Sequence, residues 1–119
     1  MKKIGMLGGL SFESTTQYYK IINRETQKRL GGTASAEILM YSFNFAEVEA
    51  LQTAGNFKAL TEKMVHWAKA LKTAGADFII ICANTMHRMA PDIVKQADIF
   101  VLHIAEVTGK AIKKQGMKK

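Results

Sequence analysis

The stretch FIIICANTMH, residues 78–87, decides the fold of this chain. Its first four residues are apolar and mostly β-branched, which is typical of a strand buried on both faces of a parallel sheet. The polar residues that follow would lie at the carboxyl end of that strand, where open α/β sheets bind ligands. Asn84 suits the N-cap position of a helix that starts at Thr85. This segment therefore combines a thiol, an amide, a hydroxyl and free backbone N–H groups, the local chemistry of a carboxylate-binding site.

Strands and helices alternate along the rest of the chain. Apolar runs predict strands at 3–7, 37–43, 78–81 and 99–102, and apolar residues at helical spacing predict helices at 12–30, 45–51, 57–74, 85–96 and 104–115. Pro91 should kink the fourth of these helices or restart it. The alternation predicts right-handed βαβ units, and therefore an α/β fold with a parallel sheet and helices on both faces.

Composition limits the class of protein. A chain of 119 residues has the size of a single domain, and a hydrophobic content of 48% with one proline argues against disorder. A single cysteine excludes an internal disulfide framework and fits a reducing compartment. No apolar run approaches the ~18 residues that a membrane span requires. We therefore expect a cytoplasmic protein that does not engage a membrane.

The net charge of +7 is concentrated at the end of the chain, where residues 110–119 carry five lysines and no acid. A basic tail can bind nucleic acid. It can equally be the solvated end of a helix whose lysines complement the helix dipole. Because no aromatic residue interleaves with these lysines, we favour the second interpretation and expect no nucleic-acid partner.

Glycines surround the end of the first predicted strand. Gly5, Gly8 and Gly9 do not match the dinucleotide fingerprint, because Leu7 and Leu10 stand where it requires glycines. The alternatives are a tight turn whose backbone approaches a small anion at a helix N-terminus, or the same turn without a ligand.

The lone cysteine, Cys82, also has two interpretations. It can be a small buried apolar residue, or a reactive thiolate activated by the helix that follows. His66, His87 and His103 lack the spacing of metal ligands, so we expect no metal.

Five segments together resemble the aspartate/glutamate racemase family. They are KIGMLGGLSFEST (3–15), LQTAGN (51–56), GADF (75–78), CANTMH (82–87) and LHIA (102–105), and they occur in the order and at the spacing of the family. The resemblance implies a cofactor-independent amino-acid racemase built from two similar α/β domains. The substrate would lie in the cleft between the domains, with one acid/base residue from each domain on opposite sides of its α-carbon. By resemblance, Leu10, Gln52, Ala83, Asn84 and Thr85 line the substrate.

The chain departs from this family pattern in two respects. It corresponds to the N-terminal domain alone, residues 1–119, so the C-terminal domain with the second base is absent. In addition, Ala83 stands where the family has an acid/base Cys or Thr, and Cys82 is displaced by one position. Either Cys82 acts as the catalytic residue because the pleat is lost after the strand, or this half supplies no base. We favour the second alternative, because a one-residue shift points a strand side chain to the opposite face.

The resulting prediction is the N-terminal half of an aspartate/glutamate-type racemase that acts by two-base α-proton transfer, inactive on its own and without a cofactor. The alternative is a non-catalytic amino-acid-binding module that has lost the base at Ala83. We expect an amino acid and the missing C-terminal domain as partners. Apolar surface left exposed without that domain could also favour a homo-oligomer.

Overall fold

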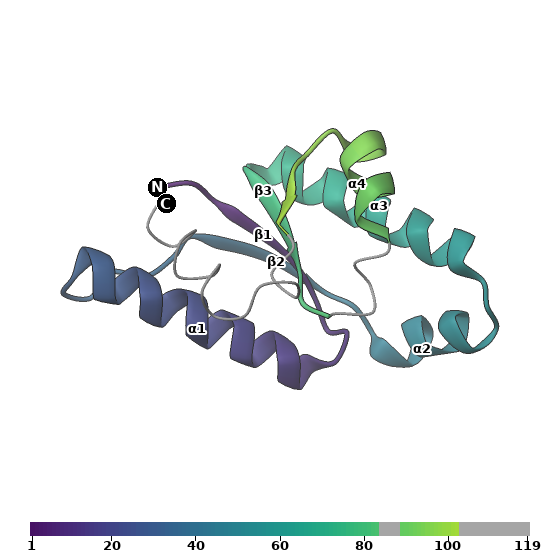
Figure 1. Ribbon diagram of the computed structural model, residues 1–119, viewed down its shortest axis with the longest axis horizontal. Coiled ribbons are helices and arrows are strands. Elements are labelled where there is room, and N and C mark those ends of the chain that lie inside the picture. Colours follow the sequence, from purple (N-terminus) through teal and green to yellow (C-terminus); the bar gives the residue numbers. More distant parts are fainter. Residues whose placement is uncertain (84–88, 103–119) are drawn as a thin grey trace.

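A computed structural model of the chain describes residues 1–83 and 89–102, which form an α/β fold around a four-stranded parallel sheet (Figure 1). The strands lie in the order β2-β1-β3-β4. Their bounds are Ile4–Gly8 for β1, Ile38–Ser42 for β2, Phe78–Ile81 for β3 and Val101–Leu102 for β4. The central strand β1 is paired on both sides, since Leu7 is in register with Tyr41 of β2 and with Ile81 of β3. The predicted parallel α/β fold is confirmed.

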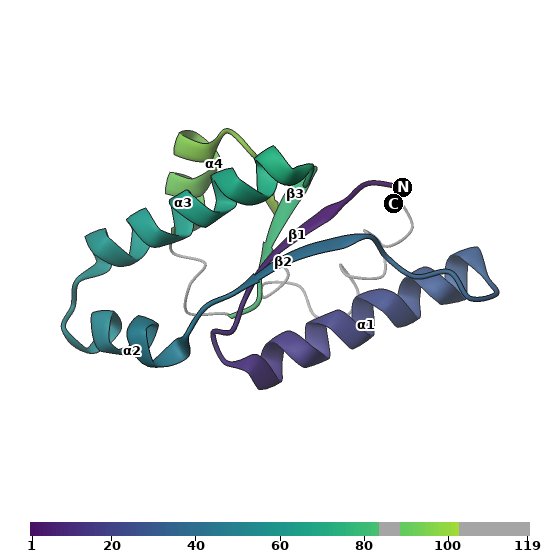
Figure 2. The ribbon, with the colours of Figure 1, turned by 180° about the vertical axis from the view of Figure 1, so that it is seen from behind.

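Helices cover both faces of the sheet, as the alternation of elements predicts. Helix α1 (Phe12–Leu30) lies against one face, and α3 (Phe57–Ala74) and α4 (Ala90–Ala97) lie together against the other (Figure 2). The short helix α2 (Phe45–Thr53) follows β2 and packs against α3. Within the described residues, no helix combines the length and the apolar character that crossing a membrane would need.

Each face of the sheet has its own apolar core, because side chains alternate along the strands. We call these the α1 core and the α3 core after the helix that covers each. Met6 and Ile80 point into the α1 core, whereas Leu7 and Ile81 point into the α3 core. The buried members of the α1 core are Ile4, Met6, Ile22, Phe78, Ile80, Cys82 and Leu102.

Local sequence signals set most helix boundaries. Helix α1 has the predicted bounds and ends at Gly31. The Asn56 side chain accepts a hydrogen bond of 3.2 Å from the backbone N–H of Ala59 and so caps α3. That helix ends at Gly75, whose φ of 118° lies in the left-handed region that glycine tolerates. These signals explain why both long helices were predictable.

The helix predicted at 85–96, with a kink or a restart at Pro91, is observed in its second part. Helix α4 begins at Ala90, which agrees with a restart, and residues 84–88 lie outside the described residues. Pro91 lies in the first turn, where its missing N–H costs no helical hydrogen bond. The predicted N-cap role of Asn84 falls outside the described residues.

The last strand is shorter than predicted. Among the residues that the structure describes, only Val101 and Leu102 are in register with β3, opposite Ile79 and Ile80. The strand predicted at 99–102 therefore begins two residues late, whereas β1 and β2 differ from their predicted bounds by one residue at each end. The helix predicted at 104–115 and the lysine-rich tail lie outside the described residues.

Candidate functional site

The carboxyl ends of the adjacent strands β1 and β3 define the candidate site. Leu7 and Ile81 pair across these strands, so the turn that begins at Gly8 and the segment that begins at Cys82 leave the sheet side by side. Leu10 and Ala83 both pack with the α3 core. The structure thus brings two of the predicted substrate-lining residues to the same side of the sheet.

The glycine pair after β1 is required by packing. A Cβ atom at Gly8 would lie 2.6 Å from Cγ2 of Thr15. A Cβ atom at Gly9, whose φ is 79°, would lie 2.3 Å from the carbonyl oxygen of Phe43, a backbone atom that no side-chain movement displaces. Gly8 also accepts a hydrogen bond of 2.8 Å from the N–H of Phe43. Contacts within the protein therefore suffice to explain both glycines without a bound anion.

Thr15 organises the turn between β1 and α1. Its Oγ1 accepts a hydrogen bond of 2.8 Å from the N–H of Gly9 and donates one of 3.1 Å to the carbonyl oxygen of Ser11. The side chain is buried although it is polar. No sequence pattern assigns Thr15 this role; the available signal is a threonine four positions after the N-cap Ser11, behind two glycines. Among the described residues, the Ser11 hydroxyl makes no capping hydrogen bond to the start of α1.

The pleat of β3 continues past its last residue. The N–H of Cys82 donates a hydrogen bond of 3.0 Å to the carbonyl oxygen of Leu7, which extends the ladder to β1. Cys82 follows Ile80 into the α1 core, and Ala83 packs with the opposite α3 core. The geometry agrees with the alternative in which a one-residue displacement reverses the direction of the side chain.

The environment of Cys82 keeps its thiol protonated. The residue is 0% exposed, and burial raises the pKa of the thiol to about 12. Tyr18, half-buried on α1 and packed against the same core, has its pKa raised by its own burial and by the nearby Cys82. A thiol in such surroundings is a poor base and a poor nucleophile at neutral pH. The catalytic role of Cys82 stays a prediction that these surroundings do not favour.

The other predicted site residues are only partly located. Gln52 is half-buried in the last turn of α2, the helix that adds Val48 and Leu51 to the α3 core. Asn84 and Thr85 lie outside the described residues. His66 is exposed and makes an edge contact with Trp67, with ring centroids 5.0 Å apart.

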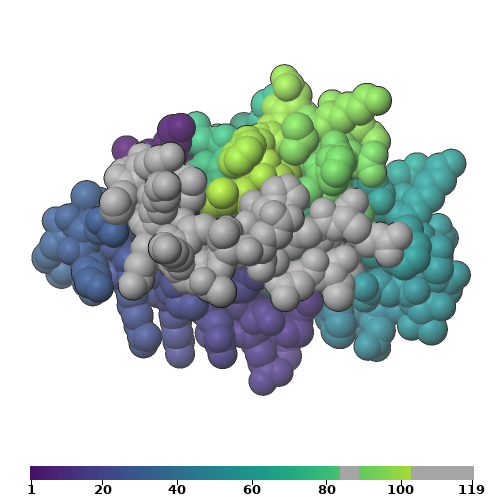
Figure 3. Space-filling view, viewed as in Figure 1, coloured from purple at the N-terminus to yellow at the C-terminus, as the bar shows by residue number. Residues whose placement is uncertain are grey.

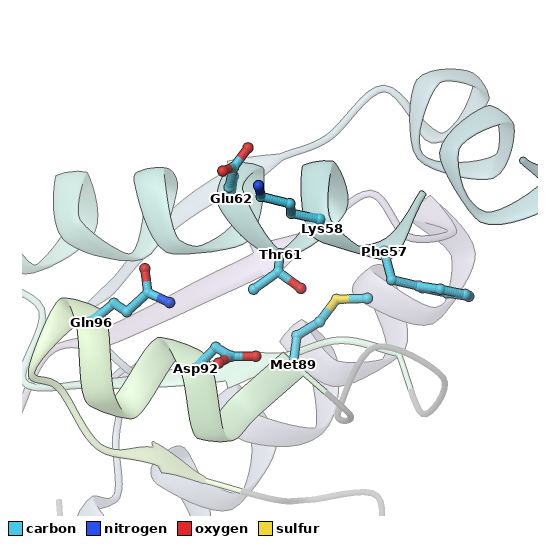
Figure 4. Close-up of a pocket in the computed structure, with 7 residues that line it drawn as sticks. All are labelled: Phe57, Lys58, Thr61, Glu62, Met89, Asp92 and Gln96. Carbon is cyan, nitrogen blue, oxygen red and sulfur yellow. The ribbon is translucent and has the colours of Figure 1, made fainter. Parts of the chain in front are cut away.

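Two grooves are found on the surface of the described residues, and Thr15 is one of the residues that line the second. A groove of about 420 Å³ separates α3 from the start of α4, where Thr61 and Phe57 face Met89 and Asp92 (Figure 4). Its charged lining residues are all exposed to solvent, so they do not form a preorganised binding site for a ligand. A second, mainly apolar groove of about 340 Å³ lies between α1 and β2. The space-filling view shows α1 and α4 on opposite sides of the molecule (Figure 3).

Comparison with known proteins identifies the family. The family model described as Asp/Glu/hydantoin racemase matches residues 7–119. The chain is 44% identical to a putative Asp/Glu racemase from Yersinia pestis, with a TM-score of 0.87. The match covers 98% of the present chain and 50% of the Yersinia pestis chain. The present chain is 32% identical to an aspartate racemase homologue from Pyrococcus horikoshii, with a TM-score of 0.81 and the same coverage. The chain spans half the length of these two relatives, and it belongs to the Asp/Glu/hydantoin racemase family.

Proposed function

We propose that this chain supplies the N-terminal half of the substrate site of a cofactor-independent racemase for aspartate, glutamate or a similar amino acid. The observation that carries the proposal is the placement of Leu10 and Ala83 on one side of the sheet, after two strands paired through Leu7 and Ile81. Family membership supports the type of reaction, and this placement supports the choice of this end of the sheet as the substrate side.

The proposed role of this half is to hold the α-carboxylate of the substrate. Removing an α-proton leaves negative charge that extends into the carboxylate, so donors aimed at that group lower the barrier. The first turn of α1 is one source of such donors, because helix N-termini carry unsatisfied N–H groups and a partial positive charge. We infer that Asn84 and Thr85 contribute further donors, and that Gln52 lines the same pocket.

We further propose that this half supplies no acid/base group. Ala83 has no transferable proton, and the adjacent thiol of Cys82 lies in the opposite core with its pKa raised to about 12 by burial. Two-base racemisation requires one group to remove the α-proton and another to return it from the far side. A second domain would be needed to complete the site, and the chain alone should be inactive.

The test is α-proton exchange in heavy water, followed by NMR or mass spectrometry with aspartate and glutamate as substrates. We expect the 119-residue chain to leave the α-proton in place over hours. A two-domain family member with demonstrated racemisation, assayed in parallel, should exchange the α-proton for deuterium. Exchange catalysed by the isolated chain would show that it contains a working base.

A second candidate function, a non-catalytic amino-acid-binding module, is favoured specifically by Ala83. A module of this kind would keep the carboxylate donors and lack the proton chemistry. Calorimetric titration with aspartate and glutamate, combined with the exchange assay, separates the two functions. Binding without exchange in a protein that carries both domains would support the module, and binding with exchange would support the racemase.

A further inference from the structure

The turn between β1 and α1 is held from its interior by one side chain. Oγ1 of Thr15 accepts a hydrogen bond of 2.8 Å from the N–H of Gly9 and donates a hydrogen bond of 3.1 Å to the carbonyl oxygen of Ser11. These two peptide groups flank Leu10, which the proposed function places against the substrate. One hydroxyl therefore anchors the backbone on both sides of a substrate-lining residue.

We propose that Thr15 is a positioning residue of the amino-acid site: its hydroxyl fixes the Gly9-Leu10-Ser11 backbone in the conformation that receives the substrate carboxylate. The inference rests on the proposed function, since it assigns Thr15 a role in that same site. A site for an anion must hold its donors in place before the ligand arrives, because reorganisation reduces affinity. Thr15 itself does not touch the substrate.

The arrangement differs from the usual threonine hydrogen bond in a helix. Thr26 of α1 is also buried, and its Oγ1 donates a hydrogen bond of 2.8 Å to the carbonyl oxygen of Ile22, four residues earlier. Thr16 makes the same bond to Phe12 at 2.9 Å. Such bonds satisfy the hydroxyl within its own helix. Thr15 differs from both, because its Oγ1 also accepts a hydrogen bond from a backbone donor outside the helix, the N–H of Gly9.

The space around Thr15 leaves little freedom for its side chain. A Cβ atom at Gly8 would lie 2.9 Å from its Oγ1 as well as 2.6 Å from its Cγ2. The absence of a side chain at Gly8 therefore lets Thr15 approach the strand closely enough to reach the N–H of Gly9. Gly8 and Thr15 therefore act together, because the missing side chain of Gly8 leaves space for Thr15. We call the two hydrogen bonds of Thr15 Oγ1, with Gly9 and with Ser11, the Thr15 clamp.

The experiment compares three variants of the whole chain by calorimetric titration with aspartate and glutamate. Thr15→Val keeps the shape and removes the hydroxyl, and Thr15→Ser keeps the hydroxyl. Thr26→Val is the matched control, because it removes a buried hydroxyl from the same helix without freeing a donor in the turn. We expect Thr15→Val to weaken binding about tenfold, the scale of one lost buried hydrogen bond, and the other two to stay within about twofold of wild type.

Hydrogen exchange at the Gly9 amide gives an independent readout. Exchange in the folded wild type should be as slow as in β1, and about tenfold or more faster in Thr15→Val but not in Thr26→Val. If Thr15→Val fails to fold, the wild-type amide decides the question. Amide hydrogen exchange at Gly9 as fast as at the exposed Gly32 would contradict a stable hydrogen bond from Gly9 to Thr15 and so overturn the inference.

The outcomes distinguish this inference from the function on which it rests. If the wild-type chain binds neither amino acid, the proposal that this half holds the substrate carboxylate fails, and the role of Thr15 in the site fails with it. If the wild type binds and Thr15→Val binds equally well, only the role of Thr15 is overturned. Equal weakening by Thr15→Val and Thr26→Val would also overturn it, because general destabilisation would then explain both.

Discussion

Cys82 and Ala83 are consecutive residues whose side chains belong to opposite cores. Cys82 lies under α1 with Ile80, and Ala83 packs against the residues covered by α3. The hydrogen bond of 3.0 Å from the N–H of Cys82 to the carbonyl of Leu7 keeps the segment extended at this point. Moving a thiol by a single position should therefore change its surroundings completely.

The first prediction concerns thiol reactivity. Burial raises the pKa of Cys82 from an ordinary value of 9.0 to about 12, so its thiolate fraction at neutral pH falls by about three orders of magnitude. An aromatic disulfide reagent should leave the folded wild type unmodified and react promptly after denaturation. The double variant Cys82→Ala, Ala83→Cys should react in the folded state. Rapid labelling of the folded wild type would contradict the burial of Cys82.

The second prediction concerns stability at high pH. The unfolded thiol ionises near pH 9, whereas the folded thiol retains its proton to about pH 12. The unfolded state then binds fewer protons, and stability falls as pH rises between these values, by about 1.4 kcal/mol per pH unit. Urea unfolding should give a difference in the free energy of unfolding between wild type and Cys82→Ala that is constant from pH 7 to 8. Above pH 9 the excess stability of the wild type should become smaller. A growing advantage would mean that the fold stabilises the thiolate.

The third prediction compares two glycines with nearly equal φ angles. Gly9 has a φ of 79° and Gly31 a φ of 80°, but a Cβ atom meets the Phe43 backbone only at Gly9 and nothing within 4 Å at Gly31. Gly31→Ala should cost about 1–3 kcal/mol of unfolding free energy from its backbone conformation alone, because a φ of 80° with a ψ of 174° is one that side chains rarely adopt. Gly9→Ala should cost more, about 3 kcal/mol or beyond, because backbone atoms must also move.

The control for this pair lies within the experiment, since both variants add the same methyl group at the same φ. Chemical denaturation supplies the two free energies of unfolding. Equal losses at Gly9 and Gly31 would show that the approach of Phe43 to the turn is looser than the structure describes.

The fourth prediction concerns an aromatic pair that ties the edge strand β2 to α3. The rings of Tyr41 and Trp67 stack with centroids 3.7 Å apart and planes inclined by 10°. A double-mutant cycle with Tyr41→Leu and Trp67→Leu should give a coupling of about 0.5–1.5 kcal/mol. The cycle of Tyr41→Leu with His66→Leu should give no coupling, because His66 is exposed and contacts only Trp67 of this pair.

The sequence determines most of the fold through features that act locally. The Ile-rich run of β3, the cap at Asn56 and the stop at Gly75 each depend on a few neighbouring residues, so the long elements were predicted within about one residue. Helix α4 was not, because Pro91 is compatible with either a kink or a first turn. The structure settles the choice by starting the helix at Ala90.

The candidate site was predictable only in part. The alternation of side chains gave the opposite orientations of Cys82 and Ala83 from strand periodicity alone. The clamp by Thr15 was not predicted, because it depends on the distance between a helix and the end of a strand, which no local pattern encodes. The grooves beside α3 and α1 arise from packing between elements and were unpredictable for the same reason.

The origin of the glycine pair has a consequence for tracing function among relatives of this chain. Gly8 and Gly9 are held in place by Thr15 and Phe43, which belong to the scaffold. A relative of this chain with an unrelated function would still need both glycines in order to fold. The presence of both glycines in a relative is therefore evidence for the shared fold and not for a shared reaction.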